Sequence, residues 1–540
     1  MKQLYISAIV LMLCMGYKAS PQVAIIPNPS EIRELQGQFT LDKKTRISFD
    51  QSIPDLKQAV DQFREYLKVP MGFELKYGGQ SPGSGDIRIV LDSSAVNLEG
   101  YSLKVLTDGI ELRARKSAGV FYGLQTLRQL LPPGIEHRVA TSGKWVIPAV
   151  EITDYPRFAY RGFMLDVARH FQPVEVLKRF IDLLSFYKLN HFHLHLTDDQ
   201  GWRIEIKKYP QLQEISAWRK KSIVGRADKK PLTYDSIRHG GYYSQNQLKE
   251  LVKYAQDHFI TLVPEIEMPG HSTAALAAYP ELACFPKKFE VTPDYGVFED
   301  VYCTKESTFK FLEDVLSEVT EIFPGSMIHI GGDECPKARW KACPDCQQRM
   351  KDENLKSEEE LQSYFIKRIR DFLAGKGRNI VGWDEIIEGG LAEGATLMYW
   401  RTWLGADHIA EAANSGFKVI MTPLDPCYFN LYEDEEREIT PLAYPGLIPL
   451  KKVYDYNPVP QKLTGEAVKN IIGIQANLWS EYVKNGEIAE YMTFPRLCAL
   501  SETAWSPAGL KNYSDFIQRL KVNSKHLDLL KVNYSEYFRK

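Results

Sequence analysis

The stretch RGFMLDVARHFQPVEVLKRFIDLLSFYKLNHFHLHLTD, residues 161–198, decides the fold. It begins and ends with short apolar runs, and between them apolar residues recur at the spacing of an amphipathic helix. A strand, a helix and a second strand in this order are typical of a parallel βα unit, whose strands are buried on both faces.

The same alternation continues downstream. Further strands are expected at ITLVPEIE, MIHIGGDE, NIVGWDE, TLMYW, KVIMTP and IIGIQANLW (260–267, 327–334, 379–385, 396–400, 418–423 and 471–479). Together with the first two strands they make eight, and helical patterns separate most of them. The sequence therefore predicts an α/β fold built on a (β/α)8 TIM barrel.

The length of 540 residues favours more than one domain. Upstream of the barrel, short strands and a helix at 117–131 predict a small α+β domain. We expect an N-terminal non-catalytic domain at 22–150, the barrel at 155–506, and a C-terminal helical extension at 507–540 packed on the barrel.

The first residues, MKQLYISAIVLMLCMG, place a lysine before a short apolar run. This layout is typical of a secretory signal peptide, here 1–20, and the run is too short to span a bilayer. We expect export across the inner membrane to the periplasm. The alternative is a lipoprotein anchored through Cys14, and only then would the protein have a membrane partner.

The charges nearly cancel, with 67 Lys and Arg against 69 Asp and Glu. Because no overall positive field is present to attract a polyanion, nucleic acid is not expected as a partner. The composition leaves the oligomeric state open.

Seven cysteines follow Cys14, and an odd number cannot all pair within one chain. Cys343 and Cys346 have the CxxC spacing, but no second CxxC or histidine pair accompanies them to complete a zinc site. A loop disulfide between these two is the favoured interpretation, with Cys284 and Cys303 as a second candidate pair. No metal ion and no cofactor are expected.

Polar and aromatic residues follow the predicted strands at their carboxyl ends, the face on which barrel enzymes build their sites. These residues are Asp198 and Asp199, His271, Asp333 and Glu334, Trp383 to Glu385, and Trp400 with Arg401. Their convergence predicts a site at that face.

Asp333 and Glu334 form the most informative pair. They follow an apolar strand, where loss of water raises the pKa of a carboxyl group. Adjacent strand residues point to opposite sides, so both can face one site only if the chain bends after Gly331 and Gly332. Paired carboxyls perform glycosyl transfer, whereas an isolated Asp-Glu dipeptide is more often a solvated turn.

An ordered set of motifs makes the assignment specific. The segments YRGFMLDVARHF, HFHLHLTDDQGWRIE, PEIEMPGH, HIGGDE, GWDE and LWSE resemble the family 20 glycoside hydrolases, the β-N-acetylhexosaminidases. IPNPSEI and SAGVFYGLQTLRQLL resemble that family's N-terminal domain, so the resemblance covers nearly the whole chain.

The resemblance implies an exo-acting, retaining β-N-acetylhexosaminidase that removes terminal GlcNAc or GalNAc from an oligosaccharide or glycoconjugate. In such enzymes the substrate's own 2-acetamido oxygen is the nucleophile. Glu334 then protonates the leaving oxygen and later deprotonates water, while Asp333 holds the acetamido N–H and stabilises the oxazolinium-like intermediate.

Supporting roles are also implied position by position. Arg161 is similar to the arginine that binds sugar hydroxyls, and Glu481 to a carboxylate on the same ring edge. Asp198 and His271 resemble a relay behind the catalytic acid. The implied box around the acetamido methyl is Trp383, Trp400 and Trp479, with Tyr428 donating to the acetamido oxygen and Asn430 near the 4- and 6-hydroxyls.

Asn430 departs from the commoner pattern, which has Asp at that position. Two other functions stay open: a carbohydrate-binding protein on an inactive barrel, and an enzyme that releases a disaccharide. The intact acidic pair argues against the first.

Overall fold

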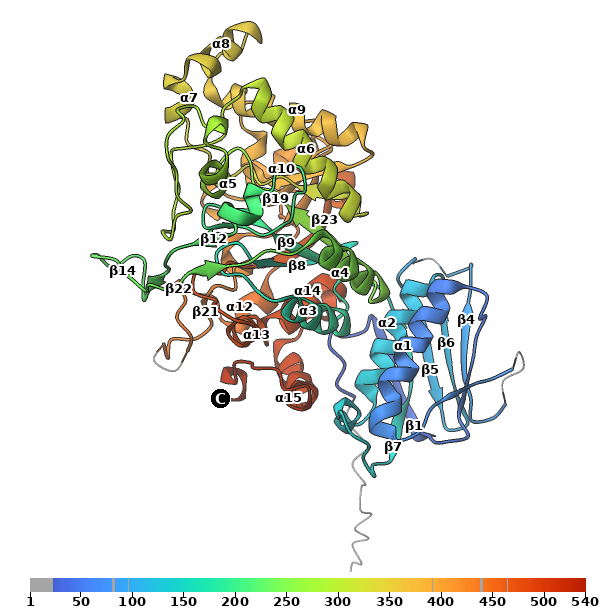
Figure 1. Ribbon diagram of the computed structural model, residues 1–540. Coiled ribbons are helices and arrows are strands. Elements are labelled where there is room, and N and C mark those ends of the chain that lie inside the picture. The colour runs from blue at the N-terminus through green and yellow to red at the C-terminus, as the bar shows by residue number, and fades with distance from the viewer. Residues whose placement is uncertain (1–22, 80–82, 96, 391, 438–439, 464) are drawn as a thin grey trace, which may run out of the picture.

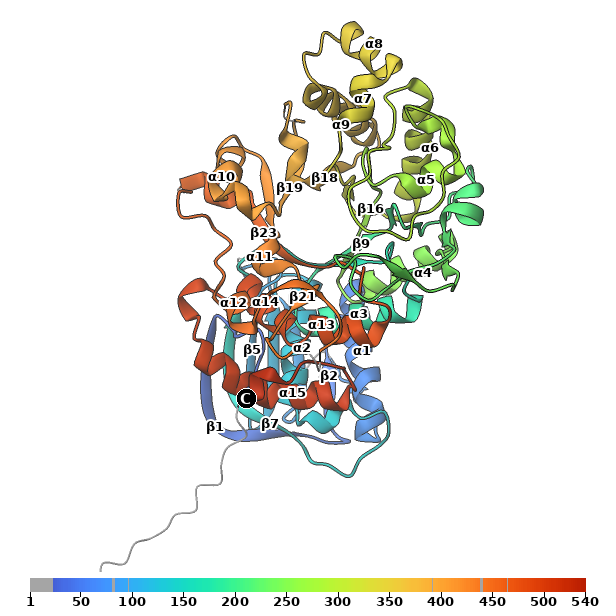
Figure 2. The ribbon, with the colours of Figure 1, turned by 90° about the vertical axis from the view of Figure 1, so that its left-hand side faces the viewer.

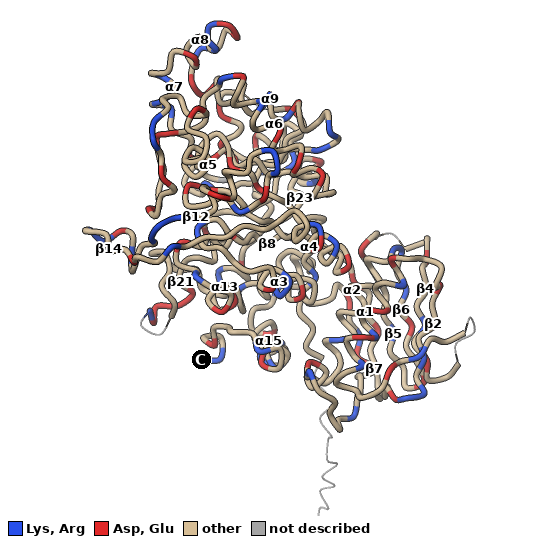
Figure 3. Tube along the Cα trace, viewed as in Figure 1, with Lys and Arg blue, Asp and Glu red and all other residues tan. Residues whose placement is uncertain are grey.

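The computed structural model describes residues 23–540 apart from 80–82, 96, 391, 438–439 and 464. The expected signal peptide and Cys14 lie outside these residues. Figure 1 shows a sheet with two helices beside a larger barrel unit, and Figure 3 shows basic and acidic residues interspersed over both. Within the described residues, no helix is both long and apolar enough to cross a membrane.

The N-terminal unit is one seven-stranded sheet in the order β1-β7-β5-β6-β4-β2-β3. Its helices α1 and α2 lie on the side of the sheet that faces the barrel (Figure 1), where Phe121 of α2 packs against Phe259 with ring centroids 4.8 Å apart. The elements are β1 (Glu31–Leu41), β2 (Arg46–Ser48), α1 (Pro54–Met71), β3 (Lys76–Tyr77), β4 (Ile87–Leu91), β5 (Tyr101–Leu106), β6 (Gly109–Ala114), α2 (Ser117–Leu130) and β7 (Trp145–Asp154).

The larger unit is a closed parallel barrel, which confirms the predicted fold class. Each of the eight predicted strands forms one of its strands, and the last pairs with the first to close it. The strands are β8 (Tyr160–Asp166), β9 (His191–His195), β16 (Thr261–Glu265), β17 (Met327–His329), β18 (Asn379–Trp383), β19 (Thr396–Tyr399), β20 (Lys418–Met421) and β23 (Ile471–Leu478).

Helices cover the outside of the barrel (Figure 2). In α3 the buried residues Leu177, Phe180, Ile181 and Leu184 recur at helical spacing, so one apolar face packs on the strands. The main helices are α3 (Val174–Phe186), α4 (Gln245–Asp257), α6 (Glu306–Ile322), α9 (Glu358–Gly375), α10 (Ala406–Asn414) and α14 (Arg496–Trp505).

The two units share buried contacts. Trp505, at the end of α14, is fully buried in the apolar core of the N-terminal unit, and its Nε1 donates to Asp154 Oδ1 at 2.8 Å. Near the C-terminus, Arg519 of α15 (Tyr513–Leu529) pairs with Glu502 of α14 and donates to Ile25 O. Buried contacts therefore join the N-terminal unit to the barrel unit.

The expected disulfides are not found among the described residues, whose seven cysteines are all free thiols. Cys303 Sγ lies 3.6 Å from Cys346 Sγ and 3.7 Å from Cys343 Sγ, whereas a disulfide needs about 2.05 Å. The two disulfides predicted from sequence spacing are therefore wrong. Instead, Cys284, Cys303, Cys343 and Cys346 form one cluster of four thiols.

Candidate active site

A pocket of about 280 Å³ opens at the carboxyl ends of the barrel strands. It lies where the sequence predicts a site, and both aromatic and acidic side chains line it. Its lining residues are Arg169, His271, Asp333, Glu334, Trp400, Leu424, Tyr428, Asn430, Leu431, Tyr444, Pro445, Trp479 and Glu481.

A sharp bend after β17 brings the acidic pair to this pocket. Gly331 and Gly332 have φ of +67° and +97°, and Glu334 itself has φ of +47°. A Cβ on Gly331 would lie 1.8 Å from the Glu267 carboxylate, so this position also needs glycine for space. The bend that the sequence required is therefore present.

The two carboxyls have different surroundings. The Asp333 side chain is 12% exposed, against 41% for Glu334. Burial raises the pKa of Asp333, and its Oδ1 is buried without a hydrogen-bond partner. Asp333 thus lines the pocket as the more buried carboxyl, while Glu334 has access to solvent for proton exchange.

His271 connects Glu334 to two carboxylates behind it. Its Nδ1 lies 2.9 Å from Asp199 Oδ2 and 3.5 Å from Asp198 Oδ1, and its Nε2 lies 3.4 Å from Glu334 Oε2. Burial alone would lower the pKa of His271, but the two aspartates outweigh it and raise that pKa well above its usual value. A charged imidazolium therefore contacts Glu334, and of the two aspartates Asp199 is nearer to His271.

Inside the barrel, Glu265 on β16 contacts histidines of the neighbouring strands β9 and β17. His195 Nδ1 lies 2.5 Å from Glu265 Oε2, and His329 Nδ1 lies 2.9 Å from Oε1. Glu265 raises the pKa of His195 to about 10 despite its burial, and burial lowers that of His193 to about 4. Glu265 and these histidines are fully buried, and their ion pairs belong to the packed interior of the barrel.

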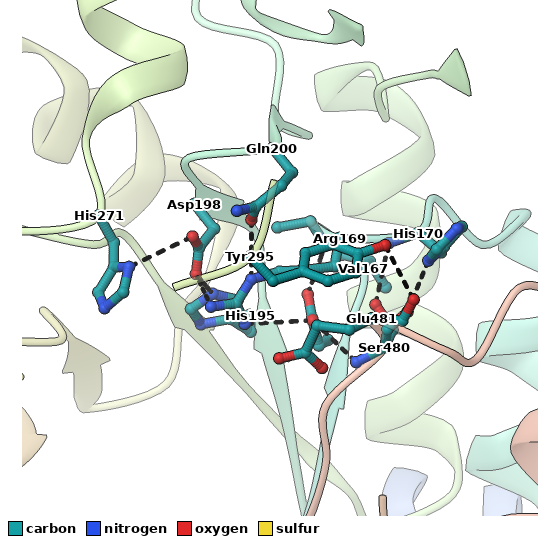
Figure 4. Close-up of polar contacts among 12 residues, drawn as sticks. Val167, Arg169, His170, His195, Asp198, Gln200, His271, Tyr295, Ser480 and Glu481 are labelled. Carbon is teal, nitrogen blue, oxygen red and sulfur yellow. Dashed lines mark hydrogen bonds and ion pairs between the residues drawn. The ribbon is translucent and has the colours of Figure 1, made fainter. Parts of the chain in front are cut away.

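Arg169 lies beside this network, in the loop after β8. Its guanidinium pairs with Asp198 at 2.7 Å, donates to Gln200 Oε1 at 2.9 Å, and lies 4.9 Å above the Trp479 ring. Figure 4 shows it between Asp198 and Glu481. It is therefore the arginine that lines the pocket.

Arg161, by contrast, is not at the pocket, and the role expected for it is corrected. It is the second residue of β8, at the amino end of the barrel, and is 1% exposed. Its guanidinium pairs with Glu99 of the N-terminal unit at 2.9 Å and donates to Phe158 O and Lys188 O. Sugar cannot reach it there, because catalytic side chains of a barrel lie at the opposite face.

The predicted aromatic residues come together. The rings of Trp400 and Tyr428 are stacked at 6.1 Å, Trp479 lies 6.1 Å from Tyr428, and Trp383 lies 5.7 Å from Trp479. Trp400 and Trp383 are anchored by donating Nε1 to Glu385 and Glu265, both at 2.9 Å. Burial raises the pKa of Tyr428 well above its usual value, so it stays a neutral donor.

Two further predicted residues complete the rim. Glu481 Oε2 and Asn430 Oδ1 are buried atoms without hydrogen-bond partners. Burial raises the pKa of Glu481 to about 7. With Asp333 Oδ1 they give three unpaired acceptors around one pocket, a pattern suited to a ligand rich in N–H and O–H groups.

Sequence reasoning assigned no role to Glu267. Its carboxyl fills the space left by Gly331, and its Oε1 accepts the Gly332 N–H at 3.1 Å. Burial and the nearby Asp333 raise the pKa of Glu267 well above its usual value. Its position two residues after β16 (Thr261–Glu265), within the PEIEMPGH motif, was a usable signal, since polar residues at strand ends were already the criterion for the site.

The comparisons with known proteins agree with this geometry. The model for glycosyl hydrolase family 20, catalytic domain, matches residues 158–508, and that for glycosyl hydrolase family 20, domain 2, matches residues 22–155. The β-hexosaminidase of Porphyromonas gingivalis is 44% identical over 95% of this chain, which spans 64% of that relative's length. The β-hexosaminidase of Vibrio furnissii is 36% identical over 89% of this chain and 76% of its own.

Solved structures resemble the whole chain. The family 20 β-N-acetylhexosaminidase of Streptomyces coelicolor has a TM-score of 0.83 and 31% identity, covering 96% of this chain and 98% of that one. The exo-β-N-acetylglucosaminidase of Vibrio harveyi, solved with N-acetylglucosamine, has a TM-score of 0.84 and 32% identity, covering 95% and 78%. The chain therefore belongs to glycosyl hydrolase family 20.

Proposed function

We propose that the protein is an exo-acting, retaining β-N-acetylhexosaminidase that removes terminal β-linked GlcNAc or GalNAc by substrate-assisted catalysis. The observation that carries this proposal is that Asp333, whose buried Oδ1 has no hydrogen-bond partner, lines one pocket together with Trp400, Tyr428 and Trp479. An acetamido group suits that space because it has an N–H donor for Asp333 and a methyl for the aromatic rings.

In the first step the acetamido oxygen attacks the anomeric carbon, and the glycosidic bond breaks as Glu334 gives its proton to the leaving oxygen. The product is a bicyclic oxazolinium ion. In the second step Glu334 takes a proton from water, which attacks the anomeric carbon and reopens the ring. Two inversions retain the β configuration.

The surroundings of Asp333 favour the charged intermediate over the ground state. Burial makes an isolated negative charge at Asp333 unfavourable, as its raised pKa shows. Positive charge developing on the acetamido group compensates that charge only as the ring forms, so the interaction is stronger in the transition state than in the bound substrate.

The pocket shape supports action at a chain end. Trp479 and Tyr428 close one side, and Arg169 and Glu481 line the rim that would hold the sugar's outer hydroxyls. Related proteins named β-hexosaminidase and exo-β-N-acetylglucosaminidase support the same substrate class.

The test is hydrolysis of an aryl β-N-acetylglucosaminide beside the matching β-glucoside. The wild type should cleave only the first, and Glu334→Gln should lose nearly all activity toward it. Asp333→Asn should retain binding of N-acetylglucosamine while kcat falls. Equal rates on the two sugars, or near-normal turnover by Asp333→Asn, would refute acetamido participation. Release of disaccharides alone would assign the alternative function.

A further inference from the structure

Four buried cysteines converge at the end of the barrel unit remote from the N-terminal unit. Cys284 and Cys303 bracket the long loop after β16, and Cys343 and Cys346 lie at the start of α8 (Pro344–Asp352). Figure 1 shows α7 (Ala338–Ala342) and α8 at that end of the molecule. All four Sγ atoms lie within 4.8 Å of one another.

Their spacing is that of ligands around one metal ion. The Sγ separations are 3.6 Å for Cys284 to Cys346, 3.6 Å for Cys303 to Cys346, and 3.7 Å for Cys303 to Cys343. Zinc bound by four thiolates has Zn–S distances of about 2.3 Å, which places the sulfurs of a regular tetrahedron about 3.8 Å apart. Cys303 and Cys346 each have two neighbours at this distance, whereas a disulfide would give each sulfur a single bonded partner.

The surroundings also suit a closed structural site. The four side chains are at most 7% exposed and lie in a small apolar core with Val301, Trp340, Met350 and Leu361. Lys305 lies beside the cluster, donating to Ala283 O at 3.3 Å next to Cys284 and pairing with Asp345 at 3.7 Å. With four protein ligands and no open position, the site would be structural.

The cluster holds the base of a loop that reaches the active site. Residues 285–302 leave the cluster at Cys284 and return at Cys303. Within this loop Tyr295 donates to Glu481 O at 2.9 Å, and Asp294 O accepts from Gln200 Nε2 at 2.7 Å. Gln200 in turn accepts from Arg169.

Cys343 and Cys346 are close in sequence to the proposed catalytic acid, because only residues 335–342 separate Glu334 from Cys343. We propose that Cys284, Cys303, Cys343 and Cys346 bind one structural Zn²⁺ ion, which ties the loop at residues 285–302 to the segment that follows Glu334. The metal thereby fixes the Glu481 wall relative to the catalytic acid, without contacting substrate. The zinc site itself does not depend on the proposed function.

The first experiment measures metal and thiols in the full wild-type chain purified without chelator. We expect about one zinc per chain, with the four cysteines unreactive until an organomercurial releases the metal. Two disulfides by mass spectrometry under non-reducing conditions would overturn the proposal. So would four metal-free thiols, or iron in place of zinc.

Variants locate the site. Cys303→Ala and Cys346→Ala should each abolish zinc binding and lower the Tm, while the control Cys498→Ala, at a fully buried position on α14, should retain zinc. Full zinc content in either cluster variant would contradict the assignment.

Reversible removal of zinc from the wild type tests the link to the loop even if a variant fails to fold. Chelation should lower the Tm and raise KM for an aryl β-N-acetylglucosaminide, and Zn²⁺ but not Mg²⁺ should restore both. Loss of zinc that leaves KM and Tm unchanged would refute the loop-holding role. If no glycoside is cleaved at all, the proposed function fails, but the zinc content and the Tm still test the metal site.

Discussion

Arg161 and Arg169 occupy opposite ends of the first barrel strand, and this decides their roles. Arg161 lies near the start of β8 in a buried pair with Glu99, whereas Arg169 follows its end and lines the pocket. Both occur in one motif, so sequence similarity alone did not separate them. The rule that barrel sites lie at the carboxyl ends of strands does separate them.

Replacing each arginine should therefore give different defects. Arg169→Ala should lower kcat/KM by roughly 10- to 100-fold, since it removes charge-assisted hydrogen bonds at the sugar rim. Arg161→Ala should instead lower the free energy of unfolding by about 3 kcal/mol, because it leaves Glu99 unpaired, with normal kcat for the folded enzyme. Steady-state kinetics and denaturant unfolding check both, and a catalytic defect confined to Arg161→Ala would reverse the assignment.

We predict that Asn430 influences how well the site tolerates a charge at the substrate's 6-position. Its Oδ1 is unpartnered at the pocket and carries no formal charge. Asn430→Asp should reduce kcat/KM selectively for a 6-sulfated aryl N-acetylglucosaminide, because two negative groups would then face each other. The unsulfated substrate is the control, and comparable rates of wild type and variant on the sulfated one would rule out this role.

At the scale of elements, the turn after β17 positions the acidic pair. Gly331→Ala should destabilise the protein by several kcal/mol and abolish activity, because its Cβ would displace the Glu267 carboxylate. Gly377→Ala is the matched control, with a similar φ of +71° and no atom within 4 Å of the added Cβ. The control should lose only about 1 kcal/mol and keep its activity.

The segment after β21 (Leu431–Tyr432) makes stability depend on pH. Glu433 is buried with its Oε2 3.8 Å from Arg496 Nε and with neither carboxyl oxygen hydrogen-bonded, and burial raises its pKa from 4.5 to about 7. The folded state thus holds this proton more tightly than the unfolded state, so stability is lost as pH rises from about 4.5 through 7.

The Glu433→Gln variant should not show this loss of stability with rising pH, because glutamine does not ionise. Relative to wild type, the variant should be about equally stable at pH 4.5 and more stable at pH 8, by on the order of 1–3 kcal/mol. Urea unfolding at the two pH values measures the difference. A variant whose advantage is the same at both pH values would show that Glu433 has the same pKa in the folded and unfolded protein.

For the whole molecule, the sequence predicts the barrel well because its strands are continuous apolar runs ending in polar residues. The same pattern also predicts that Asp333, Glu334, His271 and the tryptophans lie at the site. It does not show that Asp199 is nearer to His271 than Asp198, since adjacent residues are distinguished only by local backbone conformation.

The cysteine cluster illustrates what sequence spacing cannot provide. Cys284 and Cys303 belong to the loop after β16, while Cys343 and Cys346 belong to the connection after β17. Neighbouring barrel strands bring these two connections together, so the four sulfurs meet only in the folded chain. The spacing of one CxxC alone therefore favoured a local disulfide.

The central claim is that the substrate's acetamido oxygen is the nucleophile, enclosed by the tryptophans and oriented by Asp333. The most direct measurement is kcat/KM for one aryl glycoside carrying N-acetyl, N-fluoroacetyl, N-difluoroacetyl and N-trifluoroacetyl groups. Each fluorine withdraws electrons from that oxygen, so the account predicts a steep decrease along the series. Equal values for all four substrates would contradict it, because a nucleophile supplied by the protein would not respond to this change.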